Sequence, residues 1–267
     1  NENVLTSDGA LNVNLVDDFT PWTPIGTSSA PFKGTFYGQG HTISGLYYAG
    51  GWQATYANAG LFGYVEGKVV IDGVGIVDSY FYANNSVGAL VGNVGGSSTD
   101  GSSLTISNSY NAGRVSAQVK YVGGLVGVVS SSVVINNSYN VGPVNGKNLG
   151  GGLVGSLLES ATASINNSYN SGSLTGSEKT SDDLVYVNTT GTATITNCFF
   201  TGKSQFEGNG ATKKTASEFA NGSVVKALHD WCEKDGDNCK EGGLNGSVWG
   251  QDQRNPNSLP DLSGVIG

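Results

Sequence analysis

A pair of short motifs that returns about every 30 residues constrains this chain more than any other feature, and the aromatic residue of the second motif recurs every 29 or 30 residues. The first motif is glycine-rich around a leucine and occurs at residues 60–63, 88–92, 123–127, 151–155 and, in degenerate form, 184–187. The second motif places an isoleucine four residues before an aromatic residue, and its copies end at Tyr80, Tyr110, Tyr139, Tyr169 and Phe199. A unit of this size cannot bury an apolar face alone, so successive units must stack on one another.

Each unit contains three short strand-like runs separated by Gly, Asn and Ser. The chain has 42 Gly, no Met and only 13% charged residues, a composition that favours turns and strands over helices. When equivalent strands lie about 4.8 Å apart, their backbones can pair and like side chains stack on like. We therefore predict an all-β fold, a right-handed parallel β-helix (β-solenoid) with coils of about 30 residues.

Stacking of the units predicts columns of like side chains. Two interior columns should each take one residue per unit: Leu61, Leu90, Leu125, Leu153 and Leu184 in one, and Ile76, Ile106, Ile135, Ile165 and Ile195 in the other. An amide ladder is expected from Asn108, Asn137, Asn167 and Asn197, with a ligand-binding row as the alternative. The tyrosine column from Tyr80 to Tyr169 should serve packing rather than form a glycan platform. Cys198 stands where other units have serine, which predicts a buried residue rather than a reactive thiol.

The ends of a solenoid need caps, because terminal coils expose strand edges and the apolar core. We expect residues 1–59 to form an N-terminal cap and the first coils, with Trp22 and Phe36 as core anchors. Residues 60–202 should form the repeats, and residues 203–267 a small C-terminal capping segment in which charged residues are more frequent.

One helix is predicted within this capping segment. The run SEFANGSVVKALHDW places Val224, Leu228 and Trp231 at helical spacing. The helix should cover the last coil with its apolar side.

The repeat resembles a known motif. Gly-Gly-Leu-Val-Gly at 123–127, followed by Ile-Asn-Asn-Ser-Tyr-Asn-Val-Gly at 135–142, is similar to the GLUG motif of bacterial exported and surface proteins. Segments at 22–46 and 215–262 are similar to those that flank such arrays, so the resemblance covers nearly the whole chain. It implies a bacterial β-helix that is secreted or displayed on the cell surface, often linked to adhesion or to polysaccharide-active assemblies. The chain departs from the motif at Asp182-Asp183, which replace a glycine pair, and at an insertion over 47–58.

Charge and composition exclude several classes of function. A net charge of −8 with only two arginines leaves no basic patch for nucleic acid. No stretch reaches the roughly 18 apolar residues of a membrane span. Some polypeptides with the GLUG motif carry a metallopeptidase domain, but that chemistry needs a His-Glu-x-x-His helix, and this chain has only His41 and His229.

The insertion provides the best candidate ligand-binding residues. Its aromatic side chains, on a glycine-rich loop, could stack on sugar rings while nearby amides bond hydroxyls. The residues are Tyr47, Tyr48, Trp52 and Tyr56. The alternative is that the loop folds these aromatics over the first coils.

The polar segment WCEKDGDNC suggests two further features. Cys232 and Cys239 could close a small disulfide loop, as expected in an exported protein, or remain free thiols. Asp235, Asp237 and Asn238 offer oxygen ligands for calcium, the only cofactor that the sequence suggests. The spacing departs from an EF-hand, so a solvated loop is the competing interpretation.

Two functions from different classes follow. The first is a non-catalytic extracellular or cell-surface solenoid for adhesion, carbohydrate binding or structural assembly, with polysaccharide or surface glycans as partners and with self-association into fibres through its ends. The alternative is a polysaccharide-processing enzyme, a lyase or glycoside hydrolase, on the same fold; however, Asp78, Asp182 and Asp183 are scattered along the coils. Carboxylates converging in a groove would favour the enzyme, and a smooth face of Ser, Thr and Asn would favour adhesion.

Overall fold

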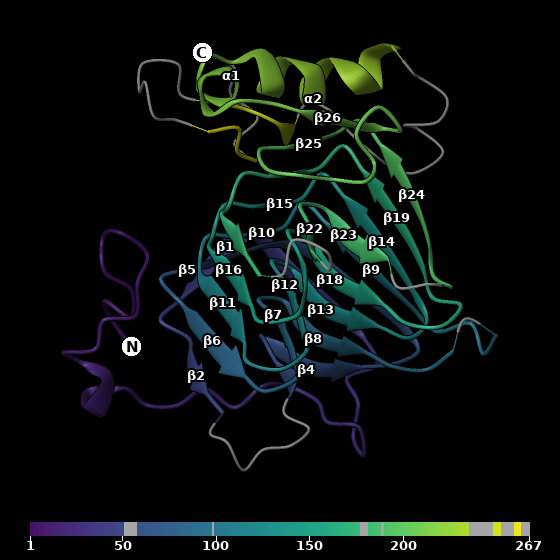
Figure 1. The fold of residues 1–267 in the computed structure, drawn as a ribbon. Helices are drawn as coiled ribbons and strands as arrows, with labels where there is room; N and C mark the ends of the chain where they lie inside the picture. Colours follow the sequence, from purple (N-terminus) through teal and green to yellow (C-terminus); the bar gives the residue numbers. More distant parts are fainter. Residues whose placement is uncertain are drawn as a thin grey trace.

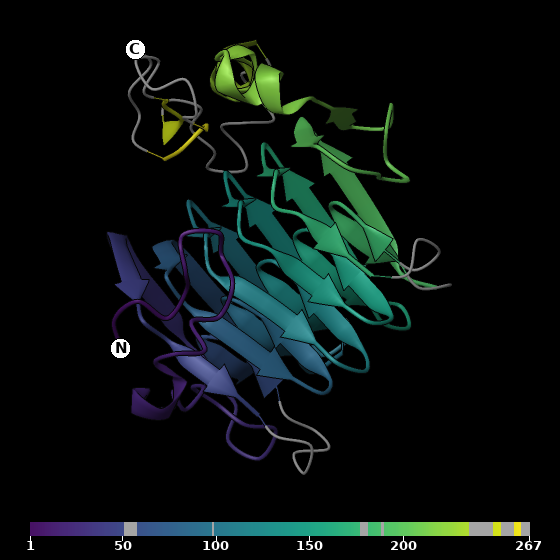
Figure 2. The ribbon, with the colours of Figure 1, turned by 60° about the vertical axis from the view of Figure 1, so that its left-hand side comes forward.

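Parallel strands, stacked coil upon coil, make up most of the molecule in the computed structural model (Figure 1). The structure describes residues 1–50, 58–97, 99–176, 181–187, 190–234, 248–251 and 259–262. The view in Figure 2 shows the coils as successive layers from the purple N-terminal end to the green C-terminal end. The predicted all-β parallel solenoid is confirmed.

Each coil contributes one strand to each of several parallel sheets. The largest sheet has two arms that meet at β5 (Lys68–Val77). One arm contains β9 (Ser103–Ser107), β14 (Ser132–Asn136), β19 (Thr162–Asn166) and β24 (Thr192–Thr196), and β1 (Thr35–Ser44) pairs with β5 outside both arms. The other arm contains β10 (Tyr110–Asn111), β15 (Tyr139–Asn140), β20 (Tyr169–Asn170), β25 (Cys198–Phe200) and β26 (Ala211–Lys213).

Three five-stranded sheets complete the coils. The first consists of β2 (Tyr47–Ala49), β6 (Tyr80–Ala83), β11 (Arg114–Ala117), β16 (Val144–Gly146) and β21 (Leu174–Thr175). The second consists of β3 (Asn58–Ala59), β7 (Ser86–Gly88), β12 (Tyr121–Gly123), β17 (Leu149–Gly151) and β22 (Ser181–Asp182). The third consists of β4 (Phe62–Val65), β8 (Val91–Val94), β13 (Val126–Val129), β18 (Val154–Leu157) and β23 (Val185–Val187).

The predicted leucine column is confirmed as part of the core. All five leucines are at most 2% exposed. The backbone links the last four in order: the Leu90 N–H donates to the Leu125 carbonyl at 3.1 Å, that of Leu125 to Leu153 at 3.0 Å, and that of Leu153 to Leu184 at 2.9 Å. Stacking of identical side chains in one register therefore explains why leucine recurs in every unit.

The predicted isoleucine column is wrong in its first member. Ile71, and not Ile76, is the partner of Ile106, so the motif that ends at Tyr80 lies five residues out of register with later copies. The reason is a corner in the backbone. Asn108 turns the chain there with a φ of 49°, and one coil earlier Gly73 provides the same left-handed corner with a φ of 68°.

The same shift removes Tyr80 from the predicted tyrosine column. Tyr110 pairs with Gly75, whereas Tyr80 pairs with Arg114 on one side and Tyr47 on the other. The column therefore begins at Tyr110 and continues through Tyr139 and Tyr169 to Phe199.

The predicted amide ladder at the corners is confirmed. Asn108, Asn137, Asn167 and Asn197 all have left-handed φ values, between 46° and 49°. The Asn197 Nδ2 donates to Asn167 Oδ1, and the Asn167 Nδ2 to Asn137 Oδ1, both at 2.7 Å. Asparagine suits this position because it tolerates the left-handed region and its amide both donates and accepts.

A second amide ladder, not predicted, lies inside the solenoid. Asn111, Asn140 and Asn170 follow the column tyrosines and are fully buried. The Asn111 Nδ2 donates to Asn140 Oδ1, and that of Asn140 to Asn170 Oδ1, each at 2.8 Å. Each amide also donates to the carbonyl two residues further along its own chain. These contacts satisfy polar groups that would otherwise be buried without partners.

Cys198 occupies the predicted buried place in the serine column. In the preceding coils the hydroxyls of Ser109, Ser138 and Ser168 donate to the carbonyl two residues earlier at 2.7 Å. The Cys198 thiol lies 3.4 Å from the equivalent carbonyl of Thr196 and is fully buried. Burial raises the pKa of this thiol to about 12, so it is protonated and unreactive at neutral pH.

The N-terminal segment lies along the side of the first coils and contains one 3₁₀ turn, η1 (Val16–Asp18). The Asp78 carboxylate accepts hydrogen bonds from the backbone N–H groups of Val4 and Leu5, at 3.2 and 2.7 Å. Trp22 and Phe36 pack against the core, as predicted for the first coils.

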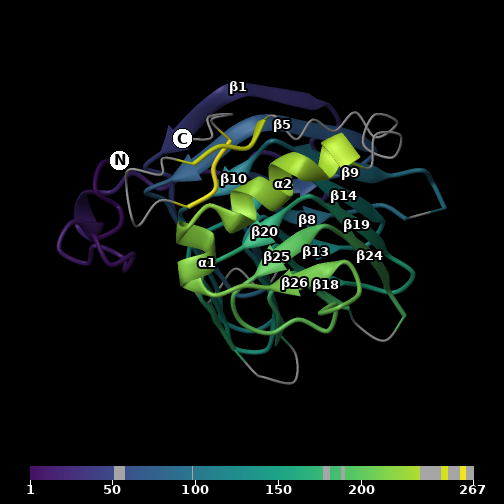
Figure 3. The ribbon, with the colours of Figure 1, turned by 90° about the horizontal axis from the view of Figure 1, so that it is seen from above.

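The C-terminal cap contains two helices where one was predicted: α1 (Ala216–Ala220) and α2 (Ser223–Lys234). They separate at Asn221-Gly222, where Gly222 has a φ of 85° that α-helix does not permit. Seen from above, the helices lie over the C-terminal end of the solenoid (Figure 3). Apolar side chains on both helices pack with Tyr169, Phe199 and Trp249. None of the described helices has the length and apolar character required to cross a membrane.

Candidate functional site

The outer side of strands β9, β14, β19 and β24 presents a regular array of short polar side chains. Because side chains alternate along a strand, the second and fourth residues of each strand enter the core, and the first, third and fifth face outward. The outward residues are Ser103, Thr105, Ser107, Ser132, Val134, Asn136, Thr162, Ser164, Asn166, Thr192, Thr194 and Thr196, of which Asn136 is only 7% exposed. All but Val134 carry a hydroxyl or an amide, and none is charged. We call this surface the hydroxyl–amide face.

The hydroxyl–amide face is a two-dimensional lattice. The strands are parallel and in register, so the outward residues form columns such as Thr105, Val134, Ser164 and Thr194. Neighbouring rows are separated by about 4.8 Å, and neighbouring columns by two residues of about 3.3 Å each. A lattice of this kind repeats its hydrogen-bonding groups in both directions across the surface.

The side chains of the lattice are held in place by each other. The Asn166 Nδ2 donates to Asn136 Oδ1 at 3.0 Å and contacts Ser164 Oγ at 3.1 Å. The threonines are β-branched, which restricts rotation about χ1. Figure 1 shows the helices over the end of the solenoid and these four strands along its side. The face is therefore an ordered outer surface before any ligand binds.

Hydroxyls and amides both donate and accept hydrogen bonds, which matches the chemistry of sugar hydroxyl groups. None of the twelve outward residues has an ionisable side chain that could serve as a general acid, base or nucleophile near neutral pH. The charged residues Lys68 and Asp72 lie on β5, at the border of the face. The face can thus bind, but its own side chains supply no acid–base chemistry.

The three acidic residues that the sequence singled out have structural contacts. Asp78 holds the N-terminal segment, as described above. Asp182 and Asp183 are only 3% and 4% exposed. Asp182 accepts from the N–H groups of Leu184 and Gln205 at 2.8 and 2.7 Å. These carboxylates do not form the open acidic groove that a polysaccharide-cleaving site requires.

Burial governs the ionisation of the acid pair. Asp183 accepts a hydrogen bond from the Gly202 N–H, yet desolvation raises the pKa of its carboxyl to about 6. Desolvation also raises the pKa of Asp182. Lys213 opposes the shift at Asp183, while the neighbouring Asp182 adds to it. The pair is therefore a pH-dependent element of the last coil.

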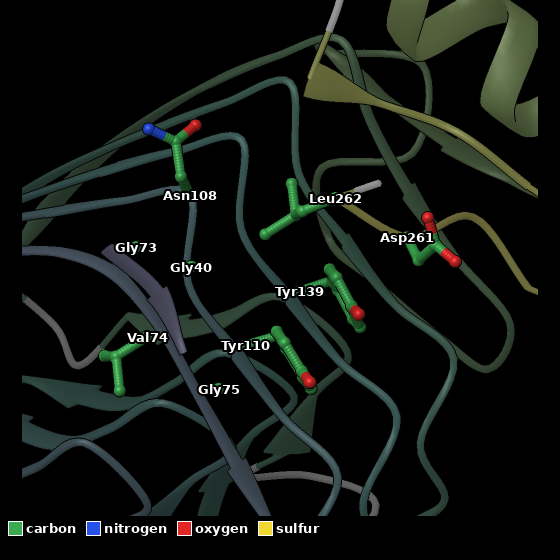
Figure 4. Close-up of a pocket in the computed structure, with 9 residues that line it drawn as sticks. All are labelled: Gly40, Gly73, Val74, Gly75, Asn108, Tyr110, Tyr139, Asp261 and Leu262. Carbon is green, nitrogen blue, oxygen red and sulfur yellow. The ribbon is translucent and has the colours of Figure 1, made fainter. Parts of the chain in front are cut away.

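The tyrosine column borders a cleft of about 240 Å³ (Figure 4). The rings of Tyr110, Tyr139 and Tyr169 are parallel, with centroids 4.8 and 4.9 Å apart. Because these faces are occupied by stacking on one another, Tyr110 and Tyr139 line the cleft beside Asn108 and Asp261 rather than forming an open platform. Tyr139 and Tyr169 are also covered by Trp249 of the cap. This arrangement supports the packing role predicted for the column.

The two described aromatic residues of the predicted binding loop, Tyr47 and Tyr48, are not brought together. Tyr47 stacks with Tyr80 at 6.1 Å and contacts Phe19, with ring centroids 5.1 Å apart. Tyr48, the next residue on β2, packs against the core and lines a separate cleft of about 320 Å³ together with Trp22. Alternation along the strand separates the two side chains. Trp52 and Tyr56 lie outside the described residues.

The structure also leaves the predicted calcium ligands and the predicted disulfide undescribed. Asp235, Asp237, Asn238 and Cys239 lie outside the described residues, and for Cys232 only the backbone, in α2, is described. Within the described part of the chain, no group of three His, Cys, Asp or Glu side chains is arranged to hold a metal ion.

Comparison with known proteins shows a related fold. No family model and no curated protein matches the chain. Among solved structures, a protein from Bacteroides ovatus named as a putative immunoglobulin A1 protease matches with a TM-score of 0.62 and 17% identity. The match covers 92% of this chain and 82% of that one. At this identity the likeness establishes the fold alone, and membership of the GLUG group stays a prediction.

The sequence did contain a signal for the hydroxyl–amide face. The runs SLTIS, TASIN and TATIT alternate short polar and apolar residues immediately before the corner asparagine. The columns of this face mix Ser, Thr, Asn and Val, so a search for identical residues does not detect them. The period of two within each run is the feature that could have revealed the face.

Proposed function

We propose that this chain is a non-catalytic extracellular or cell-surface solenoid that adheres to carbohydrate through its hydroxyl–amide face. The supporting observation is the lattice itself: twelve uncharged outward side chains on four parallel strands, all but one with a hydroxyl or an amide. Sugars expose hydroxyl groups along extended chains, and an ordered lattice can contact many of them at once.

Energetics favour an extended ligand over a small one. A single hydrogen bond of this type contributes only about 0.5–1.5 kcal/mol, because it replaces bonds to water. Several bonds formed together by a rigid surface add up, and little side-chain ordering is needed when the ligand arrives. The face should therefore bind polysaccharide chains or particles more tightly than single sugars.

The enzymatic alternatives receive less support. A lyase or glycoside hydrolase needs acidic or basic side chains at the bound sugar, and Asp182 and Asp183 are buried instead. The name of the Bacteroides ovatus protein suggests proteolysis, but function is not transferred by fold alone. This sequence has two histidines and no His-Glu-x-x-His motif.

The test is binding to insoluble polysaccharides, such as cellulose, chitin and xylan, with reducing-end release followed in the same tubes. The double variant Thr105→Lys/Thr194→Lys places two bulky charges on the lattice and should reduce bound protein about tenfold, a loss of about 1.4 kcal/mol. The matched control, Thr175→Lys/Thr212→Lys, changes two exposed threonines elsewhere and should bind like the parent. Equal binding by both variants would refute the role of the face, and sugar release would refute the non-catalytic assignment.

A further inference from the structure

The cleft at the first coil differs from the hydroxyl–amide face in shape and lining. It lies between the segment around 22–28 and strands β2 and β3, and its volume is about 320 Å³. This is near the lower end of the roughly 300–1,000 Å³ typical of small-ligand pockets. The six residues that matter for recognition are Trp22, Thr23, Thr27, Ser28, Tyr48 and Asn58.

The two aromatic residues are fixed by the fold. The Trp22 backbone N–H donates to the Tyr47 carbonyl at 2.6 Å, and its indole Nε1 donates to the Gly60 carbonyl at 3.1 Å. The indole N–H is thus already used, and the ring offers its carbon surface. Tyr48 is half-buried and packs on the core. Neither ring needs to be ordered when a ligand enters, which reduces the entropic cost of binding.

Polar groups complete the lining. Thr23, Thr27 and Ser28 are exposed and carry hydroxyls, and Asn58 adds an amide. None of the described residues that line the cleft is charged. Aromatic carbon beside hydroxyls and an amide suits a ligand with an apolar C–H surface and several hydroxyl groups, which describes a neutral pyranose.

We propose that this cleft binds one uncharged pyranose unit, such as a chain end or side branch of a glycan. The inference rests on the proposed function in taking carbohydrate as the ligand class, but it concerns a different surface. The solenoid would then contact carbohydrate in two ways: the face holds an extended chain, and the cleft holds an individual sugar.

The cleft is tested by calorimetric titration with the methyl glycosides of glucose, galactose, mannose and N-acetylglucosamine, and with galacturonic acid. At least one neutral glycoside should bind, and galacturonic acid should bind more weakly than methyl galactoside because no cationic side chain lines the cleft. Thr23→Arg, at an exposed position on the rim, should weaken the binding at least tenfold. Trp22→Phe keeps an aromatic ring and should weaken it less.

Two controls keep this result separate from the proposed function. Thermal unfolding of Thr23→Arg should match that of the parent, and its adsorption to insoluble polysaccharide through the hydroxyl–amide face should be unchanged. Conversely, Thr105→Lys/Thr194→Lys should titrate with the glycoside as the parent does. Absence of binding by every neutral glycoside, or unchanged affinity in Thr23→Arg, would overturn the inference even if the face binds polysaccharide.

Discussion

Asparagine has two distinct uses in this protein, and the backbone decides which applies. At the corners it adopts the left-handed conformation and links successive coils, and two of these corner residues, Asn137 and Asn167, are buried. After the tyrosines it is fully buried and satisfies backbone carbonyls as well as its neighbours. The interior ladder should matter more for stability, because each of its amides also bonds a buried backbone carbonyl of its own coil, which would lose that partner.

Asn140→Ala tests the interior ladder. The substitution removes bonds to the Asn170 amide and the Gly142 carbonyl, and it leaves the Asn111 amide without its acceptor. We expect the free energy of unfolding to fall by about 2–4 kcal/mol. Urea unfolding followed by circular dichroism measures the change. The control Asn209→Ala, at an exposed position, should change it by less than about 0.5 kcal/mol.

Cys198→Ser tests the serine column. A serine hydroxyl should form the short bond to the Thr196 carbonyl that its counterparts form in earlier coils. Unfolding free energy should stay within about 1 kcal/mol of the parent, whereas Cys198→Leu should lower it by about 1–3 kcal/mol through overpacking. Thermal melts of both variants are the measurement, and a large loss in the serine variant would contradict this account.

At the scale of elements, the acid pair connects the last coil to the cap. The Asp183 carboxylate accepts a hydrogen bond from the Gly202 N–H, and that of Asp182 accepts from the Ser204 hydroxyl and the Gln205 N–H. These residues lie on the connection that leads to β26 and the helices. Both side chains are buried where preceding coils have Gly151 and Gly152. The last coil has thus exchanged the close backbone contact of glycine for hydrogen bonds that fasten the connection to the cap.

The acid pair predicts a stability that decreases as pH rises. The pKa of Asp183 is raised from 3.8 to about 6 in the folded protein. The folded state therefore binds the proton more tightly than the unfolded chain, and the associated stability is present below about pH 4 and lost as pH rises through 6. The loss is roughly 3 kcal/mol at 1.36 kcal/mol per pKa unit.

Asp183→Asn isolates this contribution. The amide oxygen can still accept from Gly202, but it carries no charge, so the variant should be more stable than the parent at pH 8 and nearly equal to it at pH 4. Chemical unfolding at a series of pH values measures the difference. A difference that does not vary between pH 4 and pH 8 would contradict the assigned ionisation.

The sequence predicted the elements where one residue type has one geometric role. The leucine column, the corner asparagines and buried Cys198 are of this kind. The predicted register of the first coil was wrong because Gly73 forms the same left-handed corner as asparagine. Glycine has no side chain, so a search for recurring asparagine does not detect this corner. The hydroxyl–amide face was missed because Ser, Thr and Asn replace each other freely on an outer surface. The contacts of Asp182 and Asp183 depend on residues 202–205, which no local pattern connects to them.

At the scale of the whole molecule, each central coil adds one strand to the hydroxyl–amide face. A tandem duplication of residues 137–166 keeps the motifs in phase, because Asn136 and Asn166 are partners in register. The longer chain should retain the fold, since each coil contacts mainly its neighbours. Its face should gain one row of three side chains and extend by about 4.8 Å.

The duplicated chain should adsorb to insoluble polysaccharide several-fold more strongly than the parent, since each added hydrogen bond contributes about 0.5–1.5 kcal/mol. Its affinity for methyl glycosides in the first-coil cleft should not change. Adsorption isotherms and calorimetry make the two measurements. Unchanged adsorption of a folded, lengthened chain would argue against the lattice as the binding surface.

The strict register of the coils also has an evolutionary consequence. In most binding proteins a higher affinity requires new contacts, and each new contact has its own effect on the stability of the fold. Here the number of repeats alone can change the affinity for an extended ligand, because a gained or lost coil changes the length of the surface and leaves its chemistry intact. Recombination between similar repeats can change their number, so related chains should differ in coil count more readily than in the pattern within a coil.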